Sequence, residues 1–297
     1  MIKLTPIIVV YKQKIDECLT FNTLASILET DKFKKIIDHV VIVDNSDEKQ
    51  IYEYNKSFSN KCEDIPITYI GEMENIGIAK AYNNAIEFLS QKKDEREDWV
   101  LLLDQDSSLK EDLFDQFFNY AFHNHNDEVG IVAPRVISKN KLVSPLMVGD
   151  THHHFHEPTN LVTGLQQDRM TGINSCTFLK VAAIQAINGF DEKYPIDYLD
   201  HITFYKIFNS GYKLFVIDVE ISHDLSFYSF KTVPLSRYLI YLEARLNFIR
   251  EVSHLDKLAT RDYVKDFVFI HSKRTISNRM YKHFFKGNKV FLKAMSK

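Results

Sequence analysis

The chain has 297 residues, of which 45% are hydrophobic and 26% are charged, so it can bury a full globular core. Its three cysteines are far apart and stand in no metal-ligand spacing, which excludes a disulfide framework and a cysteine zinc site. No segment approaches the ~18–20 uninterrupted apolar residues of a membrane-spanning helix, and the first apolar stretch is interrupted by Pro6. The composition therefore predicts a soluble globular protein of a reducing compartment, the cytoplasm.

Strand and helix patterns alternate along most of the chain. The predicted strands are short apolar runs at residues 7–11, 40–43, 67–70, 100–103, 129–133 and 214–217. The predicted helices lie between them, near residues 16–28, 76–89, 110–122 and 181–187. This alternation predicts an α/β domain with a mainly parallel central sheet flanked by helices. After about residue 230 the pattern is helical, so we expect a domain over residues 1–228 and a helical, basic C-terminal extension over residues 229–297.

The predicted strand at residues 100–103 stops at two carboxylates, Asp104 and Asp106, which are separated by one residue. A run that is apolar on both faces is typical of a buried central strand, and open α/β sheets bind ligands at the carboxyl ends of such strands. Two hard oxygen ligands there suit Mg²⁺ or Mn²⁺, whose remaining ligands come from substrate phosphates. Taken alone, the pattern also fits a polar turn after a strand.

Further polar residues follow other predicted elements. Asp44 ends the second strand, and Asn75 is expected to cap the helix that starts near Gly77, whose free amides would favour an anion. An acidic pair, Asp197 and Asp200, and a lone histidine, His223, come later. Each of these has a structural explanation by itself, but their order and spacing together are more specific.

In that order and spacing the chain resembles the family 2 glycosyltransferases of the GT-A fold, particularly their bacterial rhamnosyltransferase-like branch. The resemblance runs from about residue 6 to residue 223 and leaves the last 70 or so residues outside. Its motifs are Val-Val-Tyr at 9–11, Val-Asp-Asn-Ser at 43–46, Asn-x-Gly-x-Ala at 75–79, Leu-Leu-Asp-Gln-Asp-Ser at 102–107, Thr171-Gly172, Gly-Phe-Asp-Glu at 189–192, Ile-Asp-Tyr-Leu-Asp at 196–200, Gly-Tyr-Lys at 211–213 and His223.

The resemblance implies a role for each matching residue. It places the donor nucleotide at Val9, Tyr11, Asp44, Asn75, Gly77 and Asp104. It places a divalent cation, Mn²⁺ or Mg²⁺, at Asp104, Asp106 and His223. It places the acceptor near Thr171 and Gly172.

Inverting transfer needs a general base that takes the proton of the attacking acceptor hydroxyl. Asp200 aligns with the family's catalytic carboxylate, and Asp197 is the reserve candidate, three residues earlier and expected on the same helical face. The branch places an acidic residue and then an aromatic one two and three positions after the base, where this chain has Ile202 and Thr203. This departure puts the surroundings of the base, and the acceptor, in doubt.

These implications describe a metal-dependent inverting glycosyltransferase at the cytoplasmic membrane face, in surface-polysaccharide or glycoconjugate assembly. The expected donor is dTDP-rhamnose, with a UDP-hexose as the alternative, and the acceptor is a glycan or a lipid-linked glycan. A nucleotidyltransferase is disfavoured because no glycine-rich loop follows Tyr11, and a non-catalytic homologue that acts as a binding partner is the remaining alternative. The oligomeric state, including a homodimer, stays open.

Two charged segments stand outside the motifs. Residues 267–297 contain eight basic residues and no acidic one, interleaved with aromatics, which fits docking on an anionic membrane or a solvated basic helix packed on the domain. Nucleic-acid binding is not expected, because no recognised nucleic-acid module accompanies the charge. The histidines at 152–154 and His156 are crowded into one short segment, and neighbouring histidines in such a segment seldom converge on one ion, so an acceptor-side loop is preferred to a zinc site.

Overall fold

The computed structural model describes residues 2–34, 36–63, 65–91, 97–149, 155–222, 233–252 and 257–295. Within these ranges a nine-stranded sheet has the order β3-β2-β1-β4-β11-β5-β12-β9, with β6 paired to β5. Its strands are β1 Ile2–Val10, β2 Val40–Asp44, β3 Ile67–Gly71, β4 Glu97–Asp104, β5 Val129–Ser138, β6 Lys141–Ser144, β9 Gly164–Leu165, β11 Thr177–Lys180 and β12 Lys213–Ser222. A smaller sheet joins β7 Leu146–Val148, β8 Phe155–His156 and β10 Met170–Thr171.

The sheet is mostly parallel. β1 pairs in parallel with β2 and β4, and β2 pairs in parallel with β3. β11 runs antiparallel to its neighbours β4 and β5, whereas β5 and β12 are parallel. The predicted α/β class and mainly parallel sheet are therefore confirmed.

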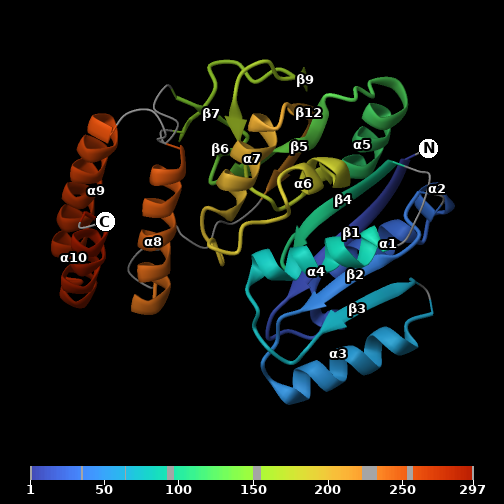
Figure 1. Cartoon of the computed structure of the whole chain (residues 1–297). Coiled ribbons are helices and arrows are strands. Elements are labelled where there is room, and N and C mark those ends of the chain that lie inside the picture. The colour runs from blue at the N-terminus through green and yellow to red at the C-terminus, as the bar shows by residue number, and fades with distance from the viewer. Residues whose placement is uncertain are drawn as a thin grey trace.

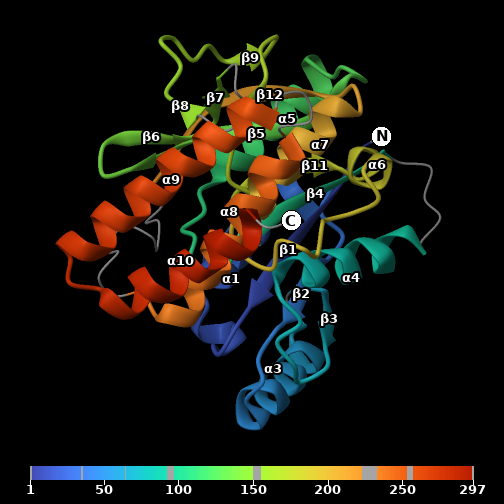
Figure 2. The same cartoon turned by 60° about the vertical axis from the view of Figure 1, so that its left-hand side comes forward.

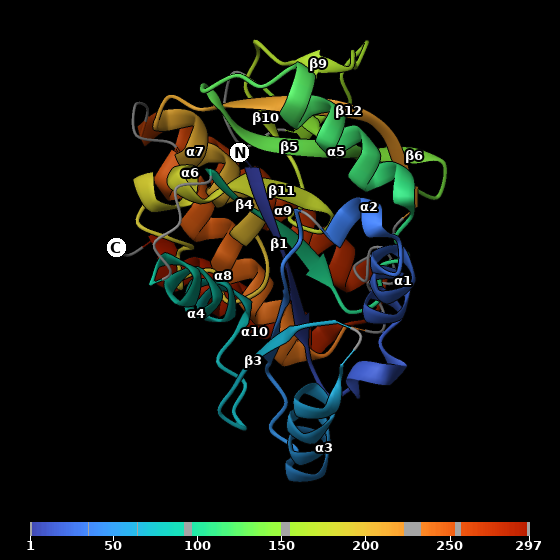
Figure 3. The same cartoon turned by 90° about the vertical axis from the view of Figure 1, so that its right-hand side faces the viewer.

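Helices cover both faces of this sheet (Figure 1; Figure 3). The helical elements are a 3-10 turn at Ile15–Glu17, α1 Leu19–Leu28, α2 Asp31–Lys34, α3 Lys49–Lys61, α4 Ile78–Ser90, α5 Glu111–His123, α6 Val181–Ala186, α7 Leu199–Asn209, α8 Leu235–Val252, α9 Lys257–Ser277 and α10 Tyr281–Met295. Figure 3 shows α1 and α5 on one side of β1 and β4, and α4, α6 and α7 on the other.

Successive residues of the central strands enter different cores. On β1, Ile8 packs with α1 and α5, whereas Ile7 packs with α4 and α7. On β4, Leu103 belongs to the first core and Leu102 to the second. Because side chains alternate across a strand, both faces must be apolar, and this explains the continuous hydrophobic runs of the sequence. The same alternation puts Asp104, two residues after Leu102, on the α4 and α7 face.

The C-terminal helices extend this architecture. α8 adds Ala244, Phe248 and Val252 to the core on the α4 and α7 side, and its other face packs with α9 and α10. α9 and α10 lie on the far side of α8 from the sheet (Figure 1; Figure 2). Within the described ranges, no helix combines the length and the apolar character that crossing a bilayer requires. The predicted domain boundary at residue 228 falls outside the described residues and stays a prediction.

All six predicted strands and the predicted helices are present, but α3, α7 and the short strands β6 to β11 were not expected. Hydrophobic periodicity does not predict α3, because its buried residues, Asn55 and Ser59, are polar. The short strands have two to four residues each, too few to show a period.

Candidate active site

Asp104 is the last residue of β4, is half-buried, and pairs in register with Val9 of β1. Asp106 follows in the turn and is exposed. Between them, the Gln105 side-chain oxygen accepts a hydrogen bond from the Tyr11 amide at 2.7 Å. The residue between the two carboxylates therefore ties the ends of β1 and β4 together, and brings Val9, Tyr11, Asp104 and Asp106 to one place as predicted.

Helix α1 holds the turn that carries the two aspartates. The Thr20 hydroxyl accepts the Ser107 amide at 2.8 Å and lies 2.5 Å from the Asp104 carbonyl oxygen. The Thr20 amide donates to the Gln105 carbonyl oxygen at 3.3 Å. Thr20 is fully buried and belongs to no sequence motif, so it could not be assigned to this site from the sequence.

Two buried thiols lie within the electric field of these carboxylates. Burial raises the pKa of Cys176 to about 12, and the negative charges of Asp104 and Asp106 contribute to this rise. Burial also raises the pKa of Cys18, with a further contribution from Asp106. Both thiols stay protonated at neutral pH, and the Cys18 thiol donates to the Gln105 carbonyl oxygen at 3.0 Å. They belong to the packing beneath the turn.

Asp200 reaches the same region from α7. It lies in the first turn of that helix, is partly exposed, and accepts the His201 amide at 2.9 Å. Tyr82 of α4 connects it to Asp104: burial raises the pKa of this phenol well above its usual value, and the charges of both Asp104 and Asp200 raise it further. The predicted base and the strand-end carboxylate therefore both lie near enough to Tyr82 for their charges to act on its hydroxyl.

The Tyr82 hydroxyl is itself a notable feature of this site. It is buried, and among the described residues it has no hydrogen-bond partner. Buried hydroxyls are normally hydrogen-bonded, and exceptions mark strain, function or an unseen partner. The sequence did not indicate a role for Tyr82, because a tyrosine on the apolar face of an amphipathic helix is expected to pack in the hydrophobic core.

Asp197 has a different environment from Asp200. Both of its carboxylate oxygens accept from the guanidinium of Arg237 on α8, one of them at 2.8 Å. It precedes α7, and the intervening Tyr198 has φ 63° in the left-handed region. The expectation that Asp197 and Asp200 share a helical face is therefore wrong, because the helix begins only at Leu199.

Asp44 ends β2 as predicted but faces inward and is only 1% exposed. One of its oxygens accepts the Ser46 amide at 2.9 Å, and the other accepts from Asn55 and from the Tyr69 hydroxyl, each at 2.8 Å. These bonds hold the turn after β2. Its role toward the donor nucleotide stays a prediction.

The start of α4 differs from the expected cap. Gly77, with φ 80°, is the residue before the helix, and the Asn75 side-chain oxygen accepts the Gly77 amide at 3.1 Å. The Ile78 amide donates to the Pro195 carbonyl oxygen at 3.2 Å. Asn75 therefore closes the turn that leads into α4, and one helix-start amide is already used by the loop before α7.

Thr171 and Gly172, the predicted acceptor residues, are buried below α7. The Thr171 hydroxyl is 2.7 Å from Nδ1 of His201, whose pKa burial lowers, so this ring is neutral at pH 7. A β-carbon at Gly172 would lie 2.7 Å from the Ser144 hydroxyl and 2.8 Å from the Phe204 ring, so only glycine fits. Their contact with an acceptor stays a prediction, and His201 is a further residue that the sequence did not indicate.

Of the predicted ligands for a divalent cation, the two that the structure describes, Asp104 and Asp106, are carboxylates. Among the described residues, no group of three or more histidine, cysteine, aspartate or glutamate side chains could hold a metal ion. The third predicted ligand, His223, and the histidines at 152–154 lie outside the described residues, and His156 is exposed on β8. Asp104 and Asp106 nevertheless fit Mg²⁺ or Mn²⁺, which proteins hold with one or two carboxylates while phosphates complete the shell.

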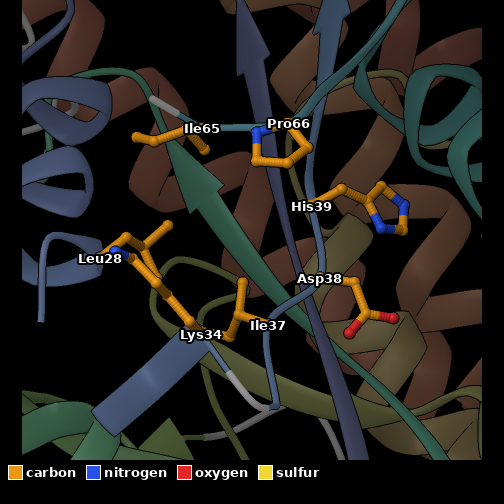
Figure 4. Close-up of a pocket in the computed structure, with 7 residues that line it drawn as sticks. All are labelled: Leu28, Lys34, Ile37, Asp38, His39, Ile65 and Pro66. Carbon is orange, nitrogen blue, oxygen red and sulfur yellow. The ribbon is translucent and has the colours of Figure 1, made fainter. Parts of the chain in front are cut away.

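A pocket of about 200 Å³ lies elsewhere, near the amino end of β2 (Figure 4). It is lined by Leu28, Lys34, Ile37, Asp38, His39, Ile65 and Pro66. Since β1 and β2 are parallel, this pocket is at the opposite edge of the sheet from Asp44 and Asp104. It is not part of the candidate site.

Comparison with known proteins agrees with this geometry. The sequence model of glycosyl transferase family 2 matches residues 7–185, which include the strand-end aspartates and the start of α4. No curated protein matches the chain in sequence.

Solved structures share the fold at low sequence identity. The structure of TarS residues 1–349 from S. aureus has a TM-score of 0.56 and 16% identity, covering 99% of this chain and 81% of that one. Mannosyltransferase PcManGT from Pyrobaculum calidifontis, solved in complex with GDP-Man and Mn²⁺, has a TM-score of 0.54 and 14% identity, covering 99% and 86%. GalNAc-T7, solved with UDP, GalNAc and Mn²⁺, has a TM-score of 0.59 and 11% identity, covering 98% and 56%.

Proposed function

Because the chain belongs to glycosyl transferase family 2, we propose that it is a metal-dependent, inverting transferase that moves a sugar from a nucleoside diphosphate donor to a hydroxyl of a glycan or lipid-linked acceptor. The proposed donor is dTDP-rhamnose, and a UDP-hexose is the second candidate. The proposed setting is bacterial surface-polysaccharide or glycoconjugate synthesis at the cytoplasmic face of the membrane.

The observation that supports this proposal is that Asp104, at the end of β4, and Asp200, at the start of α7, both act electrostatically on the buried hydroxyl of Tyr82. A single-displacement transfer needs the leaving diphosphate on one face of the sugar and the attacking hydroxyl on the other. A strand-end carboxylate and a helix-start carboxylate that approach one residue from different elements can serve these two ends of the reaction.

In this proposal, Asp200 accepts the proton of the acceptor hydroxyl as its oxygen bonds to the anomeric carbon. The bond between that carbon and the phosphate oxygen breaks, and the nucleoside diphosphate leaves with both bonding electrons. Asp104 and Asp106 would hold the divalent cation, which when bound neutralises charge on the departing diphosphate. Tyr82, protonated at neutral pH, can donate a hydrogen bond to a sugar or phosphate oxygen between the carboxylates.

The first test is the thermal stability of the purified protein with dTDP, UDP, GDP or CDP, each with and without Mn²⁺. A ligand at 100 times its dissociation constant adds ~2.7 kcal/mol, which is a resolvable shift. Stabilisation by one nucleotide that requires Mn²⁺ supports the donor site and identifies the base.

The matched variants are Asp106→Ala at the exposed carboxylate and Asp47→Ala, which removes an exposed acidic residue of the turn after β2. The first should abolish the metal-dependent shift, and the second should keep it. No metal-dependent response to any nucleotide would contradict the transferase and favour the non-catalytic homologue.

A further inference from the structure

The outer pair of C-terminal helices has one face inside the protein and one face in solvent. On α10, Phe291 is 1% exposed, and the position of Gly287 is tight against His271 of α9 and Leu242 of α8. These two residues are four apart, so they mark the inner face of α10. The opposite face points away from the rest of the molecule, on the side that Figure 2 brings forward.

That outward face of α10 carries a row of large apolar side chains. Tyr281 is 57% exposed, Phe285 is 65% exposed and Leu292 is 63% exposed. Spacings of four and seven residues place the three on one helical stripe. An isolated exposed apolar residue needs no explanation, but three aligned on one helix indicate a contact surface.

A row of lysines lies beside this apolar stripe. Lys282, Lys286, Lys289 and Lys293 are spaced by four, three and four residues, and all four are exposed. On a helix this spacing gives a second stripe, turned by roughly a quarter of the circumference from the first. The outward face of α10 is therefore half apolar and half cationic.

Helix α9 repeats the combination on its own exposed side. Phe269 is 67% exposed and Ile276, seven residues later, is 50% exposed, with exposed Lys273 between them. The sequence from residue 267 to 297 contains no acidic residue. From residue 267 onward the α9–α10 pair is therefore purely basic in its charged residues, and exposed Asp266, one turn before Phe269, is the acidic residue nearest to this surface on α9.

We propose that this surface, formed by Phe269, Lys273, Ile276, Tyr281, Lys282, Phe285, Lys286, Lys289 and Leu292, docks on an anionic lipid bilayer. The lysines would contact headgroup phosphates while the apolar stripe enters the boundary between headgroups and acyl chains. The proposal names a membrane-binding surface and does not depend on the transferase chemistry.

Other occupants fit the same surface less well. A second copy of the chain would bring together two surfaces that each carry an excess of positive charge, which costs energy. A nucleic acid would contact the lysines and could stack bases on the exposed aromatics, but it would leave the aliphatic Leu292 and Ile276 without an apolar partner. A bilayer uses both the charged and the apolar side chains.

The test is co-sedimentation of the full chain with vesicles of phosphatidylcholine alone and of equimolar phosphatidylcholine and phosphatidylglycerol. Binding to the anionic vesicles that weakens with added salt is expected. Lys282→Gln/Lys286→Gln/Lys289→Gln should weaken that partitioning by on the order of a hundredfold, since each basic residue near the surface contributes about fivefold. Phe285→Ser/Leu292→Ser should also weaken it, by at least about tenfold.

The matched control is Lys49→Gln/Lys56→Gln/Lys61→Gln, which removes three exposed lysines from α3, a helix remote from α9 and α10 (Figure 1). It should change partitioning by less than about threefold. Equal loss in the control, or wild-type binding by the Phe285/Leu292 variant, would overturn the proposed surface. So would absent vesicle binding, or capture of a single-stranded oligonucleotide in preference to vesicles. The nucleotide-dependent thermal shift should persist in every variant, so failure of membrane binding is distinct from failure of the proposed transfer.

Discussion

At the residue scale, Asp197 and Asp200 are two aspartates of one short segment whose surroundings give them different chemistry. Arg237 holds both oxygens of Asp197, so that carboxylate is committed to an ion pair. Asp200 lies in the first turn of α7 and is partly exposed, and its charge raises the pKa of Tyr82. A general base must be able to reach the acceptor hydroxyl, so Asp200 is the better candidate.

We predict that Asp200→Asn lowers kcat by about 10³-fold, because general-base catalysis contributes ~10²–10⁴. The metal-dependent thermal shift by nucleotide should remain, since the donor end of the site is unchanged. The measurement is sugar transfer under saturating donor, with Asp197→Asn as the matched control. Full activity in Asp200→Asn, with none in a folded Asp197→Asn, would reverse the assignment.

Tyr82 gives a second prediction at this scale, because its buried hydroxyl has no partner among the described residues. Tyr82→Phe removes a polar group whose desolvation is uncompensated, so the ligand-free protein should be equally stable or more stable by ~1 kcal/mol. Transfer should fall by about tenfold if the hydroxyl bonds to substrate. Urea unfolding and kcat, measured side by side, test this. Lower stability with unchanged activity would assign the hydroxyl a structural partner instead.

At the scale of elements, the helix that carries Asp200 is held from two directions. In the loop before α7, the Pro195 carbonyl oxygen accepts a hydrogen bond from the Ile78 amide of α4. In the same loop, Asp197 forms an ion pair with Arg237 of α8. On α7 itself, Lys206 pairs with Asp191 at 2.6 Å and with Glu251 of α8 at 3.3 Å. Helix α8 therefore helps to position α7. Both helices follow residue 185, where the match to the family ends.

We predict that Arg237→Ala destabilises the protein by about 2 kcal/mol, because it leaves a largely buried Asp197 carboxylate without its cation. It should also reduce kcat, since the residues before Asp200 lose a fixed position. Arg237→Lys should restore part of the stability, because it keeps the charge without the two-point geometry. The measurements are urea unfolding and kcat.

The double variant Asp197→Asn/Arg237→Ala provides the check on this interpretation. If the ion pair is the cause, the double variant should cost less than the sum of the two single variants. Strict additivity would mean that Arg237 acts through other contacts.

At the scale of the whole molecule, two buried histidines link stability to pH. Burial lowers the pKa of His201 on α7 and of His271 on α9. In the unfolded chain a histidine titrates near pH 6.5. As the pH falls below that value, the unfolded chain binds protons that the folded protein does not, so the free energy of unfolding decreases.

We predict that stability is highest above about pH 6.5 and declines toward pH 5, with a smaller decline in His201→Gln. The matched control is His123→Gln on α5, where the side chain is exposed, and its pH profile should follow the wild type. The measurement is the urea midpoint at several pH values. An unchanged slope in His201→Gln would mean that other groups cause the acid sensitivity.

The sequence alone determined the long strands of the sheet and the positions of their polar ends. Central strands such as β1 and β4 are buried on both faces, so their hydrophobic runs are unbroken and their ends are marked by Asp44, Asp104 and Asp106. Features of this kind can be recognised in the sequence because a strand, a turn or a helix start depends on neighbouring residues.

Only the tertiary structure decided which of these residues work together. Tyr82 is 22 residues from Asp104 and 118 from Asp200, and Arg237 is 40 residues beyond Asp197, so no local period connects them. Their proximity follows from how α4, α7 and α8 pack on one face of the sheet, and packing depends on burial and geometry across long separations. The same reason hid α3, whose buried side is polar, until the structure showed Asn55 bound to Asp44.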